Sequence, residues 1–109
     1  MKRPEEAEEH YKRALELRKD YAEAHNNYGN LLAEMKRPED AEKEYKRALE
    51  LREDDAKAMA NLAMLLLAQK ERVEEGKEWL KKVWALRDQL PEGEAKGYLA
   101  GLVKELGIE

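Results

Sequence analysis

Apolar residues recur at steps of three and four along the chain, and this spacing predicts amphipathic helices. One stripe contains Ala24, Tyr28, Leu31, Leu32 and Met35, and a matching stripe contains Ala58, Leu62, Leu65 and Leu66. A second kind of stripe, after Pro38, contains Ala41, Tyr45, Ala48, Leu49 and Leu51. Residues with this spacing share one face of an α-helix, so we expect helices that pack through these faces.

The pattern repeats with a fixed period of 34 residues, so that Met1 aligns with Met35 and Pro4 with Pro38. Laying residues 1–36 over residues 35–70 gives 22 identities in 36 positions. A weaker copy continues beyond residue 70 if one residue is inserted near residues 71–73. A fixed period of this length is typical of solenoids built from stacked supersecondary units. The two kinds of stripe predict that each unit contains two helices.

Six helices are expected, at residues 4–18, 21–36, 38–52, 55–70, 73–89 and 92–106. Pro38 fits the first turn of a helix, where no N–H is needed, and Glu39-Asp40 suit the positive end of the helix dipole. We expect a single domain with a half repeat at 1–20, a repeat at 21–54, a degenerate repeat at 55–90 and a capping helix at 91–109.

Charged residues occupy the other face of the helix at 38–52. They are Glu42, Lys43, Lys46, Arg47 and Glu50. Glu42 and Lys46 are four residues apart, a spacing at which opposite charges pair on a helix. This face is expected to be simply solvated.

Composition excludes several function classes. The chain is 42% hydrophobic and 42% charged, with a net charge of −4. Residues 1–55 carry −4 and residues 56–109 carry zero, so neither half has the basic field that nucleic acids require. The longest apolar run, at 62–68, is too short to span a membrane, and the absence of Cys suits a reducing compartment. We expect a cytoplasmic protein with no nucleic-acid or membrane partner.

Few residues are available for catalysis. The sequence contains no Ser, Thr or Cys and no Gly-rich phosphate loop, so the usual nucleophiles are missing. His10 and His25 fall on different expected helices without the spacing of a metal site. They are expected to be a surface residue and a packing or groove-edge residue. We predict no enzymatic activity, no cofactor and no metal.

The repeated motif resembles the tetratricopeptide repeat family, whose unit is a helix–turn–helix of this length. The likeness is carried by Asn27-Tyr28-Gly29-Asn30-Leu31-Leu32, Ala41, Tyr45, Ala48-Leu49-Glu50-Leu51 and Asn61-Leu62-Ala63. Lys36 and Lys70 depart from the family's frequent Gly in the turn, and His25 and Met59 from its frequent Trp. The resemblance implies an all-α, right-handed α-solenoid of antiparallel helix pairs with a C-terminal capping helix.

The resemblance also implies a function, because the first helices of these repeats line a concave groove that binds an extended peptide or a partner helix. The groove residues expected here are Glu23, Asn26, Asn30, Lys57, Asn61, Met64 and Leu67. Asn carries both a donor and an acceptor, which suits the backbone of an extended ligand. We expect a non-catalytic scaffold for a protein or peptide with an apolar anchor rather than a purely acidic tail.

Two features of the expected groove leave alternatives open. Asn27 and Asn61 bond either a ligand or a neighbouring helix. The helix at 55–70 is apolar nearly all round, so either the capping helix folds over its groove side, or Met64 and Leu67 are exposed to an apolar ligand. On the helix at 73–89, Trp84 aligns with the expected core, which leaves Trp79 as the surface aromatic.

Self-association is the alternative function. The stripe Ala7, Tyr11 and Ala14 corresponds to the face that, one period later, packs on the first helix of its own repeat. For this stripe the sequence offers no such partner helix. It therefore predicts a weak homodimer through this face, a fragment of a longer array, or plain exposure of the stripe.

Overall fold

Six α-helices, two short 3₁₀-helices and no strand are found in residues 3–90 and 92–108, which the computed structural model describes. The α-helices are α1 (Arg3–Leu17), α2 (Ala22–Glu34), α3 (Pro38–Leu51), α4 (Ala56–Leu67), α5 (Val73–Ala85) and α6 (Glu94–Glu105). The predicted all-α fold is confirmed. The extra residue near 71–73 lies in or beside η1 (Lys70–Arg72), and α5 ends earlier than predicted because η2 (Arg87–Gln89) follows it.

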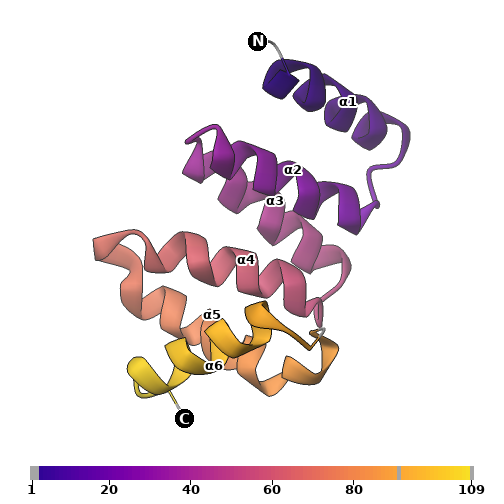
Figure 1. Ribbon diagram of the computed structural model, residues 1–109. Coiled ribbons are helices and arrows are strands. Elements are labelled where there is room, and N and C mark those ends of the chain that lie inside the picture. The colour runs from indigo at the N-terminus through magenta and orange to yellow at the C-terminus, as the bar shows by residue number, and fades with distance from the viewer. Residues whose placement is uncertain (1–2, 91, 109) are drawn as a thin grey trace.

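The helices stack as antiparallel pairs (Figure 1). α2 packs against α3 and α4 against α5, while α1 packs on α2 at the N-terminal end and α6 on α5 at the C-terminal end. The stack is elongated, with extents of 41 × 26 × 24 Å. Because a single pair cannot cover its own apolar faces, each unit depends on its neighbours for stability.

One continuous core runs through the stack. Its largest fully buried side chains are Leu32, Leu62, Leu66, Leu80, Val83 and Val103. They come from α2, α4, α5 and α6, so the stripes read from the sequence are the packed faces. Truncating one such Leu to Ala costs about 2–5 kcal/mol in a packed core.

Two glycines mark where the paired helices approach most closely. A Cβ on Gly29 of α2 would lie 2.6 Å from Cε1 of Tyr45 in α3. A Cβ on Gly76 of α5 would lie 2.9 Å from both Cγ and the backbone N of Leu67 in α4. Contacts this short are sterically forbidden, so each position needs a residue without a Cβ as the helices are packed.

The turns after α2 and α6 share one geometry. Lys36 has a φ of 61°, and the N–H of Arg37 donates to the carbonyl of Leu32 at 2.9 Å. Gly107 has a φ of 67°, and the N–H of Ile108 donates to the carbonyl of Val103 at 3.0 Å. This is the Schellman ending of a helix. α6 therefore ends as α2 does.

Candidate functional site

A polar hollow of about 250 Å³ lies where the N-terminal ends of α2 and α4 meet the turn between α3 and α4. Its lining residues are Glu23, Asn26, Asn27, Arg52, Asp55, Lys57 and Gln89. Three of them, Glu23, Asn26 and Lys57, belong to the groove expected from the sequence. The structure thus brings together the N-terminal part of that set.

The N-terminus of α4 forms one wall of the hollow and is held by two side chains. The carboxylate of Asp55 accepts from the N–H groups of Lys57 at 3.1 Å and Ala58 at 3.3 Å. From η2, Gln89 Oε1 accepts from the N–H of Ala56 at 3.0 Å. All three bonds satisfy amides that a helix start leaves without partners. The wall is therefore fixed by groups that also line the hollow.

Charge in the hollow is balanced. Glu23 and Asp55 supply two carboxylates, and Arg52 and Lys57 supply two cations. The amides of Asn27 and Gln89 complete the lining together with the buried amide of Asn26. An amide side chain carries both a donor and an acceptor. Such a surface suits a polar backbone with side chains of either charge.

The asparagines of the predicted groove also make bonds within the protein. Asn61 Nδ2 of α4 donates to Asn26 Oδ1 of α2 at 2.9 Å. Asn30 Oδ1 accepts from the Tyr45 hydroxyl at 2.6 Å. Asn61 thus bonds a neighbouring helix, one of the two roles left open by the sequence, while Asn27 lines the hollow.

The last two predicted groove residues lie apart from the hollow. Met64 is 37% exposed, on the α4 surface. Leu67 is half-buried and lies against Gly76 of α5, so its side chain belongs to the contact between α4 and α5. Its place in a groove stays a prediction. Helical spacing alone does not say which of two adjacent faces the paired helix covers.

His25 is a packing residue. It is buried, its Nδ1 lies 2.8 Å from Glu44 Oε1, and its Nε2 lies 2.9 Å from the backbone carbonyl of Lys19. A carboxylate and a carbonyl only accept, so both contacts are hydrogen bonds when the ring carries two protons. His10 is exposed, as expected.

The predicted self-association stripe on α1 is less buried than its counterpart on α3. Ala7, Tyr11 and Ala14 are half-buried, whereas Ala41 and Ala48 are fully buried. The Tyr11 ring stacks on Tyr28, with centroids 5.9 Å apart and planes 19° apart, which covers part of it. The remaining part of this face has no covering helix among the residues described.

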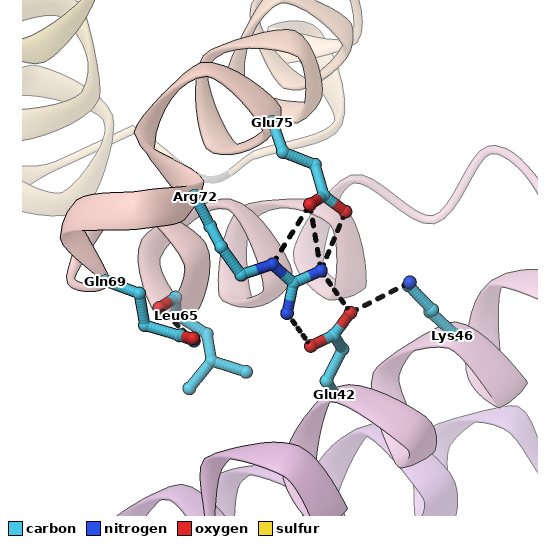
Figure 2. Close-up of polar contacts among 6 residues, drawn as sticks. All are labelled: Glu42, Lys46, Leu65, Gln69, Arg72 and Glu75. Atoms are coloured by element: carbon cyan, nitrogen blue, oxygen red, sulfur yellow. Dashed lines mark hydrogen bonds and ion pairs between the residues drawn. The ribbon is translucent and has the colours of Figure 1, made fainter.

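An ion cluster joins consecutive units on the side of α3 that was expected to be solvated (Figure 2). Arg72 of η1 donates to both carboxylate oxygens of Glu42. Its Nη1 binds Oε1, and its Nη2 binds Oε2 at 2.8 Å. Arg72 also donates to Glu75. Lys46 completes the cluster at 2.8 Å from Glu42, the predicted pair. The Glu42 side chain is only 13% exposed, so the expectation of a plain solvated face is wrong for this residue.

The same arrangement occurs one unit earlier. Arg37 Nη1 donates to Glu8 Oε2 of α1 at 2.9 Å and Arg37 Nη2 lies 3.0 Å from Asp40 Oδ2, while Lys12 lies 3.8 Å from Glu8. We call each set an inter-repeat clamp, defined as an Arg in the turn before a second helix bound to a Glu of the preceding second helix. The repeat contained this signal, because Glu8 and Glu42, and likewise Lys12 and Lys46, lie one period apart.

The clamps shift the protonation of their carboxylates. The hydrogen bond from Arg72 lowers the pKa of Glu42 to about 2, against the opposing effect of burial. The hydrogen bond from Tyr28 lowers the pKa of Glu8, and Arg37 and Lys12 add to the shift. Burial raises the pKa of Tyr28, as does its bond to Glu8, and burial raises that of Tyr45 to about 12.

Both tryptophans are half-buried and packed against the core, so they do not divide into one buried and one surface ring. Lys82 lies over the Trp79 ring at 4.3 Å and Arg87 over the Trp84 ring at 4.5 Å. Trp79 also borders a shallow surface with Lys43, Lys46 and Arg47 of α3. Each ring therefore packs against the core and also contacts a cation of the surface.

The described residues contain neither a metal-binding cluster nor a membrane-spanning helix. Within them, no cluster of three or more His, Asp or Glu could hold a metal ion. Of the helices described, none has the length and apolar character needed to cross a membrane.

Comparison with models of protein families identifies the repeat. Two models, both described as tetratricopeptide repeat, match residues 1–54 and residues 29–91. The second alone matches more than half of the chain. Such repeats generally mediate protein–protein interactions as non-catalytic scaffolds. No curated protein matches the chain.

Proposed function

The chain belongs to the tetratricopeptide repeat family, and we propose that it is a scaffold that binds an extended protein segment across the starts of α2 and α4. The observation that carries the proposal is the hollow in which Glu23, Asn26 and Lys57 meet. The scaffold contributes a shaped polar surface and no chemistry of its own.

The lining indicates what such a segment contains. Amide side chains pair with the backbone of an extended chain whatever its sequence. The two carboxylates and two cations favour a ligand with charges of both signs. Met64, exposed farther along α4, offers an adaptable apolar contact at the other end. We therefore expect a segment of mixed charge with one apolar anchor; of these two properties, the apolar anchor was predicted from the sequence.

Charge reversal at Lys57 tests the proposal better than removing an asparagine. Replacing Asn30 or Asn61 by Ala would leave Tyr45 or Asn26 without its bond, so a loss of binding would be confounded with a loss of stability. Lys57 is exposed, and no ion pair involves it among the described residues. Lys57→Glu therefore changes the hollow and leaves the fold intact.

The experiment selects binders from a random peptide library on the full chain and measures their affinity by fluorescence anisotropy. We expect Lys57→Glu to weaken the selected peptides by about tenfold or more, the cost of one lost charge contact of about 1.4 kcal/mol. Lys43→Glu, on the exposed side of α3, is the matched control and leaves affinity unchanged. Equal affinities for both variants would place the binding surface elsewhere.

Self-association through Ala7, Tyr11 and Ala14 uses a different face and remains the alternative prediction. It does not involve the hollow. Sedimentation of the chain at several concentrations measures it.

A further inference from the structure

A second hollow, of about 470 Å³, adjoins the polar hollow at the start of α4. Both hollows are lined by Glu23 and Arg52, so they form one continuous surface. The second hollow lies on the edge of the stack that contains the α1–α2 and α3–α4 turns (Figure 1). We call it the edge hollow; besides the shared pair, its lining includes Arg18, Tyr21 and Leu51. A bound segment that continues past Glu23 therefore enters the edge hollow.

Tyr21 distinguishes this place from its equivalent in the next unit. One period later the residue is Asp55, whose carboxylate caps the start of α4. The Tyr21 side chain makes no such bond to the start of α2. Its ring is 37% exposed and, in the part of the chain that the structure describes, it does not pack against the core cluster. The position thus provides an aromatic surface in place of a capping carboxylate.

The Tyr21 ring is held in place by contacts within the protein. Arg18 lies over it, with Cζ 4.6 Å from the ring centroid. Leu51, which is half-buried, adds an aliphatic contact to the same hollow. Aromatic rings pack well against Tyr rings and stack on guanidinium planes. The lining therefore suits a flat aromatic side chain.

We infer that the edge hollow binds an aromatic residue of the same extended segment that occupies the first hollow. This inference rests on the proposed function and adds a second anchor to the contact at Met64. Charge does not select this anchor, because two Arg and two acidic residues balance each other in the edge hollow. Selection comes from shape and from stacking on Tyr21.

The experiment uses the peptides selected from a random library on the full chain, restricted to those that Lys57→Glu weakens. We expect these peptides to contain an aromatic residue and Tyr21→Ser to weaken them by about tenfold, as for the loss of one packed aromatic anchor. Tyr21→Phe keeps the ring and therefore the affinity. Tyr98→Ser is the matched control, because Tyr98 is 62% exposed on α6, which contributes no described residue to either hollow.

A double-mutant cycle tests whether Tyr21 contacts the aromatic residue of the peptide. Replacing that residue by Ala should weaken binding to the parent chain by about tenfold and binding to the Tyr21→Ser chain far less. Ser suits the start of a helix, so the variant keeps its melting temperature, which circular dichroism verifies.

The outcomes separate this inference from the proposed function. If Lys57→Glu weakens the peptides but Tyr21→Ser does not, or if the Ala replacement weakens binding equally to both chains, the inference is overturned and the proposed function stands. If no selected peptide depends on Lys57, both are overturned.

A second copy of the chain is the competing partner for Tyr21. Sedimentation of the free chain at several concentrations measures it. A monomer at every concentration supports the inference. A species of twice the chain mass that Tyr21→Ser disperses and Tyr98→Ser does not makes a second copy the occupant and overturns it.

Discussion

The α2–α3 and α4–α5 pairs follow one repeat plan but place their glycine on opposite helices. In the first pair Gly29 lies on the first helix and receives the ring of Tyr45 from the second. In the other, Gly76 lies on the second helix and receives Leu67 from the first. The glycine contact of the first pair and that of the second therefore lie at different positions along their helices.

The equivalent positions of the two pairs show how moving the glycine from one helix to the other is compensated in side-chain volume. Where the first pair has Gly29 and Tyr45, the second has Ala63 and Leu80. Where the second pair has Leu67 and Gly76, the first has Ala33 and Ala41. A larger side chain on one helix is matched by a smaller one on the other, as close packing at constant helix separation requires. The period determines where the helices cross, and the local volumes determine which helix carries the glycine.

The largest effect is expected at Gly76. Gly76→Ala introduces a Cβ 2.9 Å from the backbone N of Leu67, so α4 and α5 must move apart. We expect a loss of about 3 kcal/mol in the free energy of unfolding, measured by urea denaturation. Leu67→Ala does not rescue the variant, because the clash with the backbone remains.

Gly101→Ala is the control for Gly76→Ala. Nothing lies within 4 Å of a Cβ at Gly101, so this change is expected to stabilise α6 by about 0.5–1 kcal/mol through helix propensity. A Gly76 variant as stable as the parent, or full rescue by Leu67→Ala, would show that the α4–α5 contact is looser than described.

At Gly29 the clash is with a side chain and is expected to be rescued. Gly29→Ala costs about 2 kcal/mol because the Tyr45 ring is buried and its hydroxyl is bonded to Asn30. Adding Tyr45→Leu gives this crossing the residues found at the equivalent positions of the other pair, Ala63 and Leu80. The double variant should be more stable than the sum of the two single changes by about 1–2 kcal/mol, measured as a double-mutant cycle. Additive losses would contradict the volume exchange.

The sequence predicted the parts of the molecule that depend on periodicity. Six helices and the buried stripes follow from apolar residues such as Leu32 and Leu62, because their spacing is set by the helix itself. Part of the hollow was also predicted, since Glu23, Asn26 and Lys57 occupy equivalent sides of two first helices.

The remaining contacts depend on tertiary structure that no local pattern contains. Gln89 reaches the hollow because η2 folds back to the start of α4, and Arg72 reaches Glu42 across 30 residues. The contact of Leu67 with α5 was not predicted, because only the position of Gly76 reveals where α5 packs. The clamps were detectable as a repeated Glu, but their Arg partners come from turns whose geometry the period does not define.

The clamp at Glu42 joins the two pairs, and its contribution is expected to depend on pH. The pKa of the Glu42 carboxyl is held at about 2, below the value of about 4.3 for a Glu in an unfolded chain. A carboxylate with a lowered pKa stabilises the fold above its unfolded pKa and loses this effect as the pH falls toward the folded value. We expect Glu42→Gln to cost about 1 kcal/mol at pH 7 and nearly nothing at pH 2, measured by urea denaturation.

Glu53→Gln is the matched control for Glu42→Gln. Glu53 is exposed, and the ion pairs of the described residues do not include it, so its replacement should have little effect at either pH. A loss at Glu42 that is equal at pH 2 and pH 7 would mean that packing, rather than charge, links the two pairs.

The smallest effect is expected in the turns, where the two pairs differ again. Lys36 and Lys70 lie one period apart, but only Lys36, among the described residues other than Gly, has a positive φ. Because a left-handed conformation costs an L-residue about 1 kcal/mol or more, Lys36→Gly should stabilise the protein by about 0.5–1 kcal/mol despite the greater freedom of Gly in the unfolded chain. Lys70→Gly should destabilise it slightly, since Lys70 lies in η1 and only the entropic cost remains. Thermal unfolding of both variants measures the two changes in stability. If both substitutions stabilised the protein, or both destabilised it, the extra residue in the second turn would not have changed the geometry of that turn.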